Sequence, residues 1–316
     1  MAFPWSVAWQ RAATGPEGFW PRERPSAHFV TSAGRAMADA MVMLLGQVDR
    51  RLGEAGPLDV IDVGAGDGEI LDGMACGLAD TDLGRRTRLI GIDVRPRPEG
   101  LHPAVQWIQG DGLATLPMGV VGLVMAHEWL DEIPLDVVER DADGIDRLVL
   151  VDGDGRECRG DAVDGDTAEW LARWWPLSAP RDRAEVGLSR DAAWRRLCDA
   201  VRAGTVLATD YGHDRLSRRP TLRGYRRGVI VDAVPDGSCN ITAHVSVDSC
   251  VAAGAGQGTV MSQRQALAEF DLVGVLPSPS TEPADYARAL ERSWEVRSLR
   301  SPGGLGSFHW LRADIG

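Results

Sequence analysis

Three glycines at alternate positions give this chain its clearest chemical signal. Gly64, Gly66 and Gly68 directly follow the apolar run Asp59–Val63. Glycine adopts backbone conformations that other residues avoid, and it lets the backbone approach a ligand closely. The apolar run suits a strand that is buried on both faces of a parallel sheet. The segment therefore predicts a strand, a tight ligand-binding turn and a helix that begins near Gly68.

The glycine spacing distinguishes between two kinds of ligand. A dinucleotide fingerprint places its third glycine three positions after the second, and Glu69 occupies that position here. The third glycine is Gly68 instead, and Asp62 lies two residues before Gly64. This arrangement resembles the first motif of class I methyltransferases, in which the acidic residue lies near the amino-acid end of S-adenosylmethionine (SAM). The alternative is a glycine-rich turn of some other α/β protein.

Two further strands are predicted to end in aspartate. Arg88–Asp93 has the pattern of a second buried strand, and its last residue lies where a doubly wound fold binds ribose hydroxyls. Val105–Gln109 predicts a third strand, followed closely by Asp111. In the methyltransferase class an acidic side chain at this place often meets the adenine amino group. We therefore expect Asp93 to bind ribose and Asp111 to bind adenine.

The segment after the fourth predicted strand, Val120–Ala126, carries four ionisable residues: His127, Glu128, Asp131 and Glu132. Ligands of open α/β sheets bind outside the carboxyl ends of the strands, so the reacting centre is expected here. Glu128 could hold a guanidinium in a bidentate pair and orient its nitrogen. His127 could act as a base or a hydrogen-bond anchor. Asp131 and Glu132 could instead favour the N-terminus of a following helix.

Longer motifs extend the resemblance over nearly the whole chain. They resemble segments of the MidA-like family of SAM-dependent methyltransferases, whose mitochondrial member is a respiratory complex I assembly factor that dimethylates a protein arginine. The motifs are GPEGFW (15–20), HFVTS (28–32), AHEWLDEIP (126–134), TDYGH (209–213), TLRGYRR (221–227), NITAHVSVD (240–248) and LGSFHWLRA (305–313).

The strand ends and the resemblance together imply two groups of site residues. Those expected to bind SAM are Asp62, Gly64, Gly66, Gly68, Asp93, Asp111, Gly112 and Ala126. Those expected to face the methyl-transfer site are His127, Glu128, Asp131, Asp210 and Tyr211. No metal is expected, because transfer from a sulfonium needs little beyond alignment and a route for the displaced proton.

Two departures from the family pattern bear on the acceptor. After Ser32 the family usually continues Pro-Glu-Ile-Ser, whereas this chain has Ala33-Gly-Arg-Ala36. The usual Ala-His-Val-Asp appears as Ala243-His-Val-Ser246. Each change removes a carboxylate. Three functions stay open: N-methylation of a protein arginine, O- or N-methylation of a small molecule, and a SAM-binding assembly factor that does not catalyse transfer.

The composition indicates which classes of partner and which cellular compartment to expect. The chain has 316 residues and a formal net charge of −12, which argues against a protein that coats nucleic acid. It has no lysine, so all 34 basic residues are arginine. The five cysteines are scattered without CxxC spacing, so neither a disulfide framework nor a zinc site is expected. The sequence shows no apolar run long enough for a membrane span and no signal peptide, so we expect a cytoplasmic protein without membrane contact. A homodimer is left open.

The order of predicted elements indicates an α/β fold with a mostly parallel, Rossmann-like sheet of the class I methyltransferase type, plus inserted and appended α+β elements. Residues 1–55 form a lead and a covering helix, and residues 56–140 form the SAM-binding core. Residues 141–204 form an insertion with helices, and residues 205–316 hold the remaining core strands and a substrate-region insertion. The basic run Arg218–Arg227 reads as a solvated loop and strand.

Overall fold

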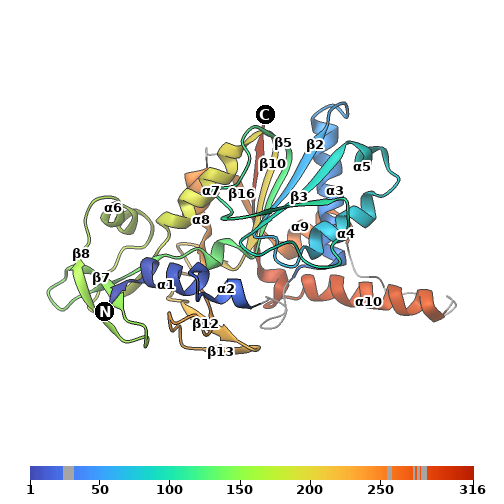
Figure 1. The fold of residues 1–316 in the computed structure, drawn as a ribbon. Coiled ribbons are helices and arrows are strands. Elements are labelled where there is room, and N and C mark those ends of the chain that lie inside the picture. The colour runs from blue at the N-terminus through green and yellow to red at the C-terminus, as the bar shows by residue number, and fades with distance from the viewer. Residues whose placement is uncertain (24–31, 255–257, 273–274, 276–277, 279–282) are drawn as a thin grey trace. The chain divides into compact units, whose positions relative to one another are not determined.

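The computed structural model describes residues 1–23, 32–254, 258–272, 275, 278 and 283–316 (Figure 1). The chain forms two compact units. The core unit comprises Thr31–His127, Leu197–Tyr211 and Gln257–Gly316. The accessory unit comprises Met1–Val30, Glu128–Arg196 and Gly212–Gly256.

A seven-stranded mixed sheet forms the centre of the core unit. Four neighbouring pairs are parallel, and the two pairs that involve β17 are antiparallel. Across the sheet the strands are β16 (Gly258–Ser262), β17 (His309–Ile315), β10 (Val201–Asp210), β5 (Val120–His127), β2 (Leu58–Val63), β3 (Thr87–Asp93) and β4 (Val105–Gln109).

The strand order creates a defined place for a ligand. The first core strand in the sequence, β2, lies between the second, β3, and the fourth, β5. The chain therefore builds the sheet outward in one direction from β2 and then in the other. In open α/β sheets the crevice at the carboxyl ends of the strands, where this reversal occurs, is the usual ligand site. Val63 and His127 end the two strands that flank it.

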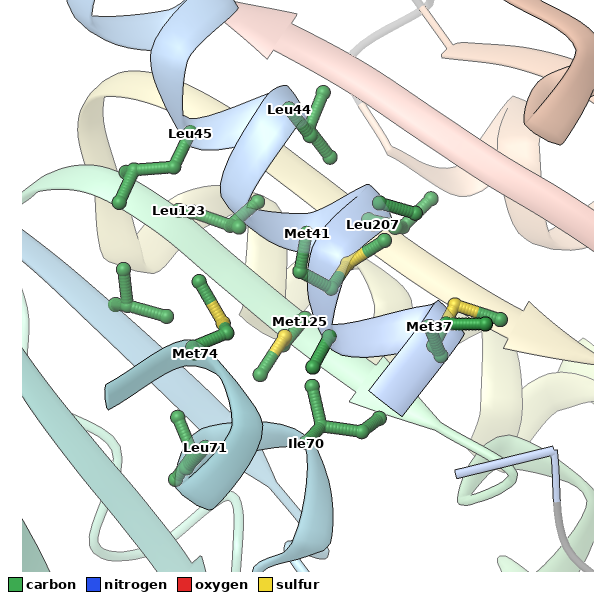
Figure 2. Packing of buried hydrophobic residues seen from close by; sticks show 14 of the residues in the cluster. Met37, Met41, Leu44, Leu45, Ile70, Leu71, Met74, Leu123, Met125 and Leu207 are labelled. Atoms are coloured by element: carbon green, nitrogen blue, oxygen red, sulfur yellow. The ribbon is translucent and has the colours of Figure 1, made fainter. Parts of the chain in front are cut away.

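Methionine and leucine side chains fill the space between the helices and this sheet (Figure 2). Helix α3 (Arg35–Arg51) repeats its apolar residues at intervals of three and four, which gives it one buried face. That face packs with helix α4 (Glu69–Leu78) and with Leu123 and Leu207 on two neighbouring strands. The remaining core-unit helices are α5 (Asp82–Arg86), α9 (Gln263–Glu269), α10 (Pro283–Leu299) and the 3-10 turn η3 (Leu305–Ser307).

The accessory unit contains smaller sheets. Its five-stranded antiparallel sheet comprises β1 (Phe3–Pro4), β6 (Asp136–Arg140), β7 (Asp146–Val151), β8 (Glu157–Ala162) and β9 (Arg183–Val186). The others pair β11 (Gly212–His213) with β15 (Val245–Ser246), and β12 (Arg223–Arg226) with β13 (Val229–Val231) and β14 (Asn240–Thr242). Its helical segments are α1 (Trp5–Thr14), α2 (Phe19–Arg22), η2 (Leu130–Glu132), α6 (Gly165–Trp174) and α8 (Val247–Ala253). Helix α7 (Leu188–Ala200) begins in this unit and ends in the core unit.

The fold is therefore α/β, as expected. Among the described residues, no helix combines the length and the apolar character needed to cross a membrane.

Candidate functional site

The glycine turn after β2 adopts the backbone that its sequence predicts. Gly64, Gly66 and Gly68 have φ of 73°, 60° and 78°, in the left-handed region that other residues rarely adopt. Gly68 is also the N-cap residue of α4, and a side-chain carbon there would lie 2.7 Å from Leu101 Cδ1. The turn thus depends on glycine through backbone conformation at all three positions and through close packing at Gly68.

Asp62 is a buried carboxylate at the end of β2. It is 2 % exposed, and among the described residues its Oδ1 atom has no hydrogen-bond partner. Burial, followed by the negative charges of Asp93 and Glu69, raises the pKa of Asp62 to about 8. A buried polar atom without a partner is costly unless a ligand satisfies it. The ammonium group of SAM is a cation of the kind that would stabilise this carboxylate in its charged form.

Asp93 holds the glycine turn from the neighbouring strand. Its Oδ2 accepts a hydrogen bond from the Gly66 backbone N–H at 2.9 Å. Its Oδ1 accepts from the backbone N–H and the side-chain Nε of Arg95, at 2.9 and 3.1 Å. Arg95 also pairs with Asp67 at 3.1 Å, so one arginine connects the turn to the end of β3. The sequence interpretation omitted Arg95 and Asp67; their nearness to the two motifs was the available signal.

Asp111 follows β4 and is exposed. Its Oδ1 accepts from the backbone N–H groups of Leu113 and Ala114, at 3.0 and 2.9 Å, so it stabilises its own turn. Gly110 N–H donates to the Asp93 carbonyl at 2.8 Å, which brings this turn next to the end of β3. The adjacent Gly112 is buried.

His127, Asp210 and Tyr211 lie at the ends of neighbouring parallel strands. His127 closes β5 and is in register with Thr209 of β10, so Asp210 is the next residue along. Asp210 is fully buried, and its Oδ1 accepts from the Tyr211 N–H at 2.9 Å. The Tyr211 ring packs on Phe308, with ring centroids 4.0 Å apart.

Two further buried residues, Ser32 and Ala126, lie next to His127. Ser32, which is 2 % exposed, places its Oγ 2.6 Å from His127 Nε2 and so fixes the orientation of the ring. Sequence reasoning did not select Ser32 as a site residue, although it lies in the HFVTS motif. Ala126, expected to contact the cofactor, is 1 % exposed and is in register with Ala208.

Glu128 has an unusual backbone for its residue type. Its φ is 51°, in the left-handed region, where a residue other than glycine is strained by roughly 1 kcal/mol or more. Such strain persists only where the surrounding structure holds the backbone in place, and it is frequent at functional positions. The Glu128 side chain is half-buried.

Asp131 and Glu132 belong to the 3-10 turn η2, whereas the alternative interpretation of these residues placed them at the start of a helix. Asp131 is 4 % exposed, and its carbonyl accepts from Ala243 N–H at 3.1 Å. Glu132 Oε1 accepts from Asn240 Nδ2 at 3.0 Å. The charge of Asp131 adds to burial in raising the pKa of Tyr225, which places that phenol in the field of the same turn.

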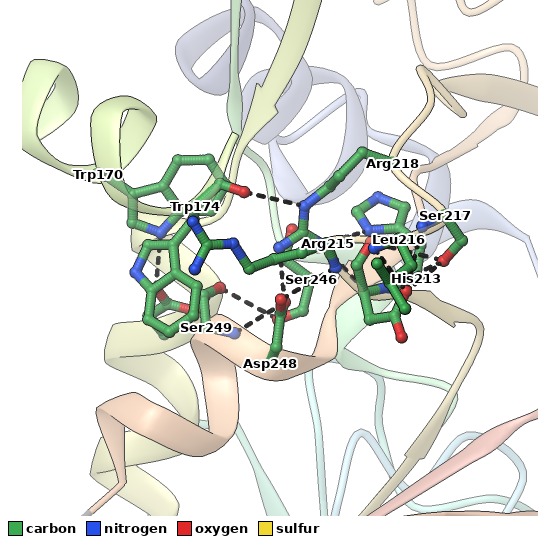
Figure 3. Close-up of polar contacts among 12 residues, drawn as sticks. Trp170, Trp174, His213, Arg215, Leu216, Ser217, Arg218, Ser246, Asp248 and Ser249 are labelled. Carbon is green, nitrogen blue, oxygen red and sulfur yellow. Dashed lines mark hydrogen bonds and ion pairs between the residues drawn. The ribbon is translucent and has the colours of Figure 1, made fainter. Parts of the chain in front are cut away.

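The departure at Ser246 lies in a buried polar network (Figure 3). The Ser246 carbonyl accepts from Ser249 Oγ at 3.1 Å, and Arg218 bonds Asp248 at 2.5 Å and His213 Nδ1 at 2.7 Å. Burial and the Arg218 charge lower the pKa of His213 to about 3, so its ring is neutral. Arg218 was expected in a solvated loop; its side chain is instead 8 % exposed, because it supports this network.

The candidates thus form two sets. In the core unit, the cofactor candidates lie at or after the ends of β2, β3 and β4, except Ala126, which lies on β5. His127, Asp210 and Tyr211 lie at the ends of β5 and β10. In the accessory unit, Glu128 and Asp131 belong to the segment directly after β5. Within the described part of the chain, no group of three or more His, Cys, Asp or Glu side chains is arranged to hold a metal ion.

Comparisons with known proteins identify the family and the fold of the chain. Residues 37–265 match the family described as "Putative S-adenosyl-L-methionine-dependent methyltransferase". A COG1565 superfamily crystal structure from Burkholderia thailandensis, bound to S-adenosylhomocysteine, shares the fold with a TM-score of 0.78 and 22 % identity over 99 % of this chain and 88 % of that one. A native structure from the same superfamily and organism gives 0.75 and 24 %, over 99 % and 87 %. No curated protein matches significantly. The chain belongs to this family of SAM-dependent methyltransferases, and SAM is its cofactor.

Proposed function

We propose that the protein is a class I methyltransferase that moves the methyl group of SAM to a nitrogen atom of a protein arginine. The observation that carries this proposal is the segment that directly follows β5 in the sequence. There Glu128 holds a half-buried carboxylate on a strained backbone, followed by the carboxylates of Asp131 and Glu132. Carboxylates suit a guanidinium because they accept paired hydrogen bonds and match its charge.

Methyl transfer to nitrogen requires few protein groups. SAM supplies a methyl group on a positively charged sulfur. As the new N–C bond forms and the S–C bond breaks, the acceptor nitrogen must lose a proton. Glu128 would accept N–H bonds from the guanidinium and turn one nitrogen toward the methyl carbon, which is a positioning role. His127, oriented by Ser32 at 2.6 Å, would take the displaced proton.

Asp62 would serve the cofactor. Its buried Oδ1 atom is suited to a cationic ammonium, and Asp93 lies beside it at the position expected for ribose recognition. The cradle of Gly64, Gly66 and Gly68 would let the backbone lie against the cofactor. Bound S-adenosylhomocysteine in the Burkholderia thailandensis structure of the same fold supports a SAM-type ligand for this fold.

The resemblance to the MidA-like family supports a protein arginine as acceptor. A small-molecule oxygen or nitrogen is the second candidate, favoured by the two departures that remove carboxylates. Of these, Ser246 is 3 % exposed, and its backbone carbonyl accepts a hydrogen bond from Ser249 Oγ.

Methyl-labelled SAM separates the candidates. The purified protein is incubated with lysate of the source organism, and label is traced to protein, small molecules or neither. The proposal predicts labelled protein that releases methylarginine on acid hydrolysis. Label confined to small molecules would favour the second candidate, and SAM binding without transfer to either fraction would indicate a non-catalytic assembly factor.

A further inference from the structure

Arg190 is a buried cation that the proposed chemistry does not use. It lies in the first turn of α7 and is 1 % exposed. A positive charge is unfavourable at a helix N-terminus, where the helix dipole is itself positive, and a charge out of water needs strong partners. Its guanidinium also lies over the buried ring of Trp9, 5.7 Å from the ring centroid.

The guanidinium binds four backbone carbonyls from two segments of the accessory unit. It donates to Asp131 O at 2.6 Å through Nη2 and to Ile133 O at 3.1 Å through Nε. Through Nη1 it donates to Ala243 O at 2.6 Å and His244 O at 2.9 Å. Charge-assisted bonds of this kind are stronger than neutral ones, and a planar fork holds several acceptors in fixed directions.

These segments are the turn after Glu128 and the stretch that contains the AHVS motif. They also contact each other directly, through Ala243 N–H to Asp131 O at 3.1 Å and Asn240 Nδ2 to Glu132 Oε1 at 3.0 Å. Within the turn itself, the N–H groups of Glu132 and Ile133 donate to the carbonyls of Trp129 and Leu130, each at 3.3 Å. The Arg190 guanidinium adds bonds to the same turn from another element, α7.

We infer that Arg190 is a positioning residue for methyl transfer. It fixes the carbonyls of Asp131 and Ile133, and so fixes the direction of the acceptor-binding carboxylates on the turn that follows the strained Glu128. The inference rests on the proposed function for the role of those carboxylates. Lysine could not replace Arg190, because a single nitrogen with three donors cannot reach four carbonyls on both sides of a planar fork.

Arg190→Lys tests this inference, with Arg195→Lys as the matched control. Arg195 lies on the same helix, is exposed and donates to one carbonyl, Ala253 O, at 3.1 Å. S-adenosylhomocysteine affinity, kcat and KM for the labelled acceptor, and hydrogen exchange of the Ala243 amide are measured for each variant. We expect Arg190→Lys to retain cofactor affinity within about twofold, to lose tenfold or more in kcat/KM and to speed Ala243 exchange about tenfold. The control should match wild type throughout.

The outcomes separate this inference from the proposed function. Wild-type kcat/KM in Arg190→Lys, with active wild-type enzyme, would overturn the inference alone. If the wild-type enzyme transfers no methyl group while Ala243 exchange still depends on Arg190, the proposed function fails and Arg190 is only structural. If the lysine variant does not fold, Arg190→Met is compared with wild type in the same measurements. Methionine removes the charge instead of burying it with fewer hydrogen bonds.

Discussion

At the scale of single residues, Asp62 links cofactor binding to pH. In the cofactor-free protein its pKa is raised to about 8, so at neutral pH it is largely protonated. A bound cation favours the charged form and lowers this pKa, so binding must release a proton. SAM affinity should therefore fall as pH drops below about 8, by up to roughly tenfold per pH unit.

Calorimetry between pH 6 and 9, in buffers of different ionisation enthalpy, measures both the affinity and the proton release. Asp62→Asn should bind SAM weakly and with little pH dependence. Asp111→Asn is the control, because that carboxylate is exposed and should keep the wild-type slope. Affinity in the wild-type protein that does not change with pH would contradict the assignment of Asp62 to the cofactor cation.

The same carboxylate should limit stability at high pH. A folded-state pKa raised from 3.8 to about 8 means that the folded form binds the proton more tightly, so its stabilising effect is full in acid and is lost as pH rises through 8. Without cofactor, Asp62→Asn should therefore melt several degrees above wild type at pH 9, and the difference should shrink toward pH 5. Thermal unfolding at both pH values checks this. A variant that is less stable than wild type at pH 9 would contradict it.

Glu128 is expected to lower the stability of the fold while it supports methyl transfer. Since its φ is 51°, Glu128→Gly should raise the free energy of unfolding by about 1 kcal/mol while abolishing transfer. Glu54→Gly is the matched control: its φ is 56° and its side chain is exposed, so it should stabilise the protein without affecting transfer. Denaturant unfolding gives the first quantity and methyl labelling the second. Full activity in Glu128→Gly would remove Glu128 from the site.

At the scale of elements, a side chain added in the glycine turn should affect SAM affinity more than a side chain added at a glycine elsewhere. Gly66→Ala should weaken SAM binding tenfold or more, because a left-handed backbone at φ 60° resists a side chain where the cofactor lies. Gly100→Ala carries the same penalty, with φ 79° and open space around it, but lies outside the predicted pocket. Equal SAM affinity in the two variants would show that the turn does not contact the cofactor.

Sequence patterns located the buried parallel strands closely, since these strands read as continuous apolar runs. The predicted strand Arg88–Asp93 differs from β3 by one residue. The predicted ends of helices and strands were less accurate where they depend on pairing with distant strands. Ser189–Arg202, followed by Gly204, has the pattern of one helix. Helix α7 instead stops at Ala200 and β10 begins directly at Val201, because the last residues pair with β5. The run Ser307–Leu311 predicts a final strand. That strand exists as β17, but its bounds differ: a 3-10 turn ends at Ser307, and β17 runs from His309 to Ile315.

At the scale of the molecule, the sequence predicts which side chains lie at the strand ends but not which residues support them. Asp62, Asp93 and the glycines follow from one local motif and its neighbour. Ser32 contacts His127 across 95 residues of sequence, and Arg190 contacts Ala243 across 53. Such partners depend on how distant segments meet, and no local spacing encodes them.

The most direct test of the account follows a deuterated methyl group from SAM into the acceptor, with wild type and Glu128→Gln compared by mass spectrometry. We expect wild type to place the label on an arginine side chain of a protein. Glu128→Gln should bind S-adenosylhomocysteine as wild type does and label the same arginine at least about a hundredfold more slowly, as expected for lost positioning. Label on an oxygen or a small molecule, or equal rates for the two proteins, would contradict the account.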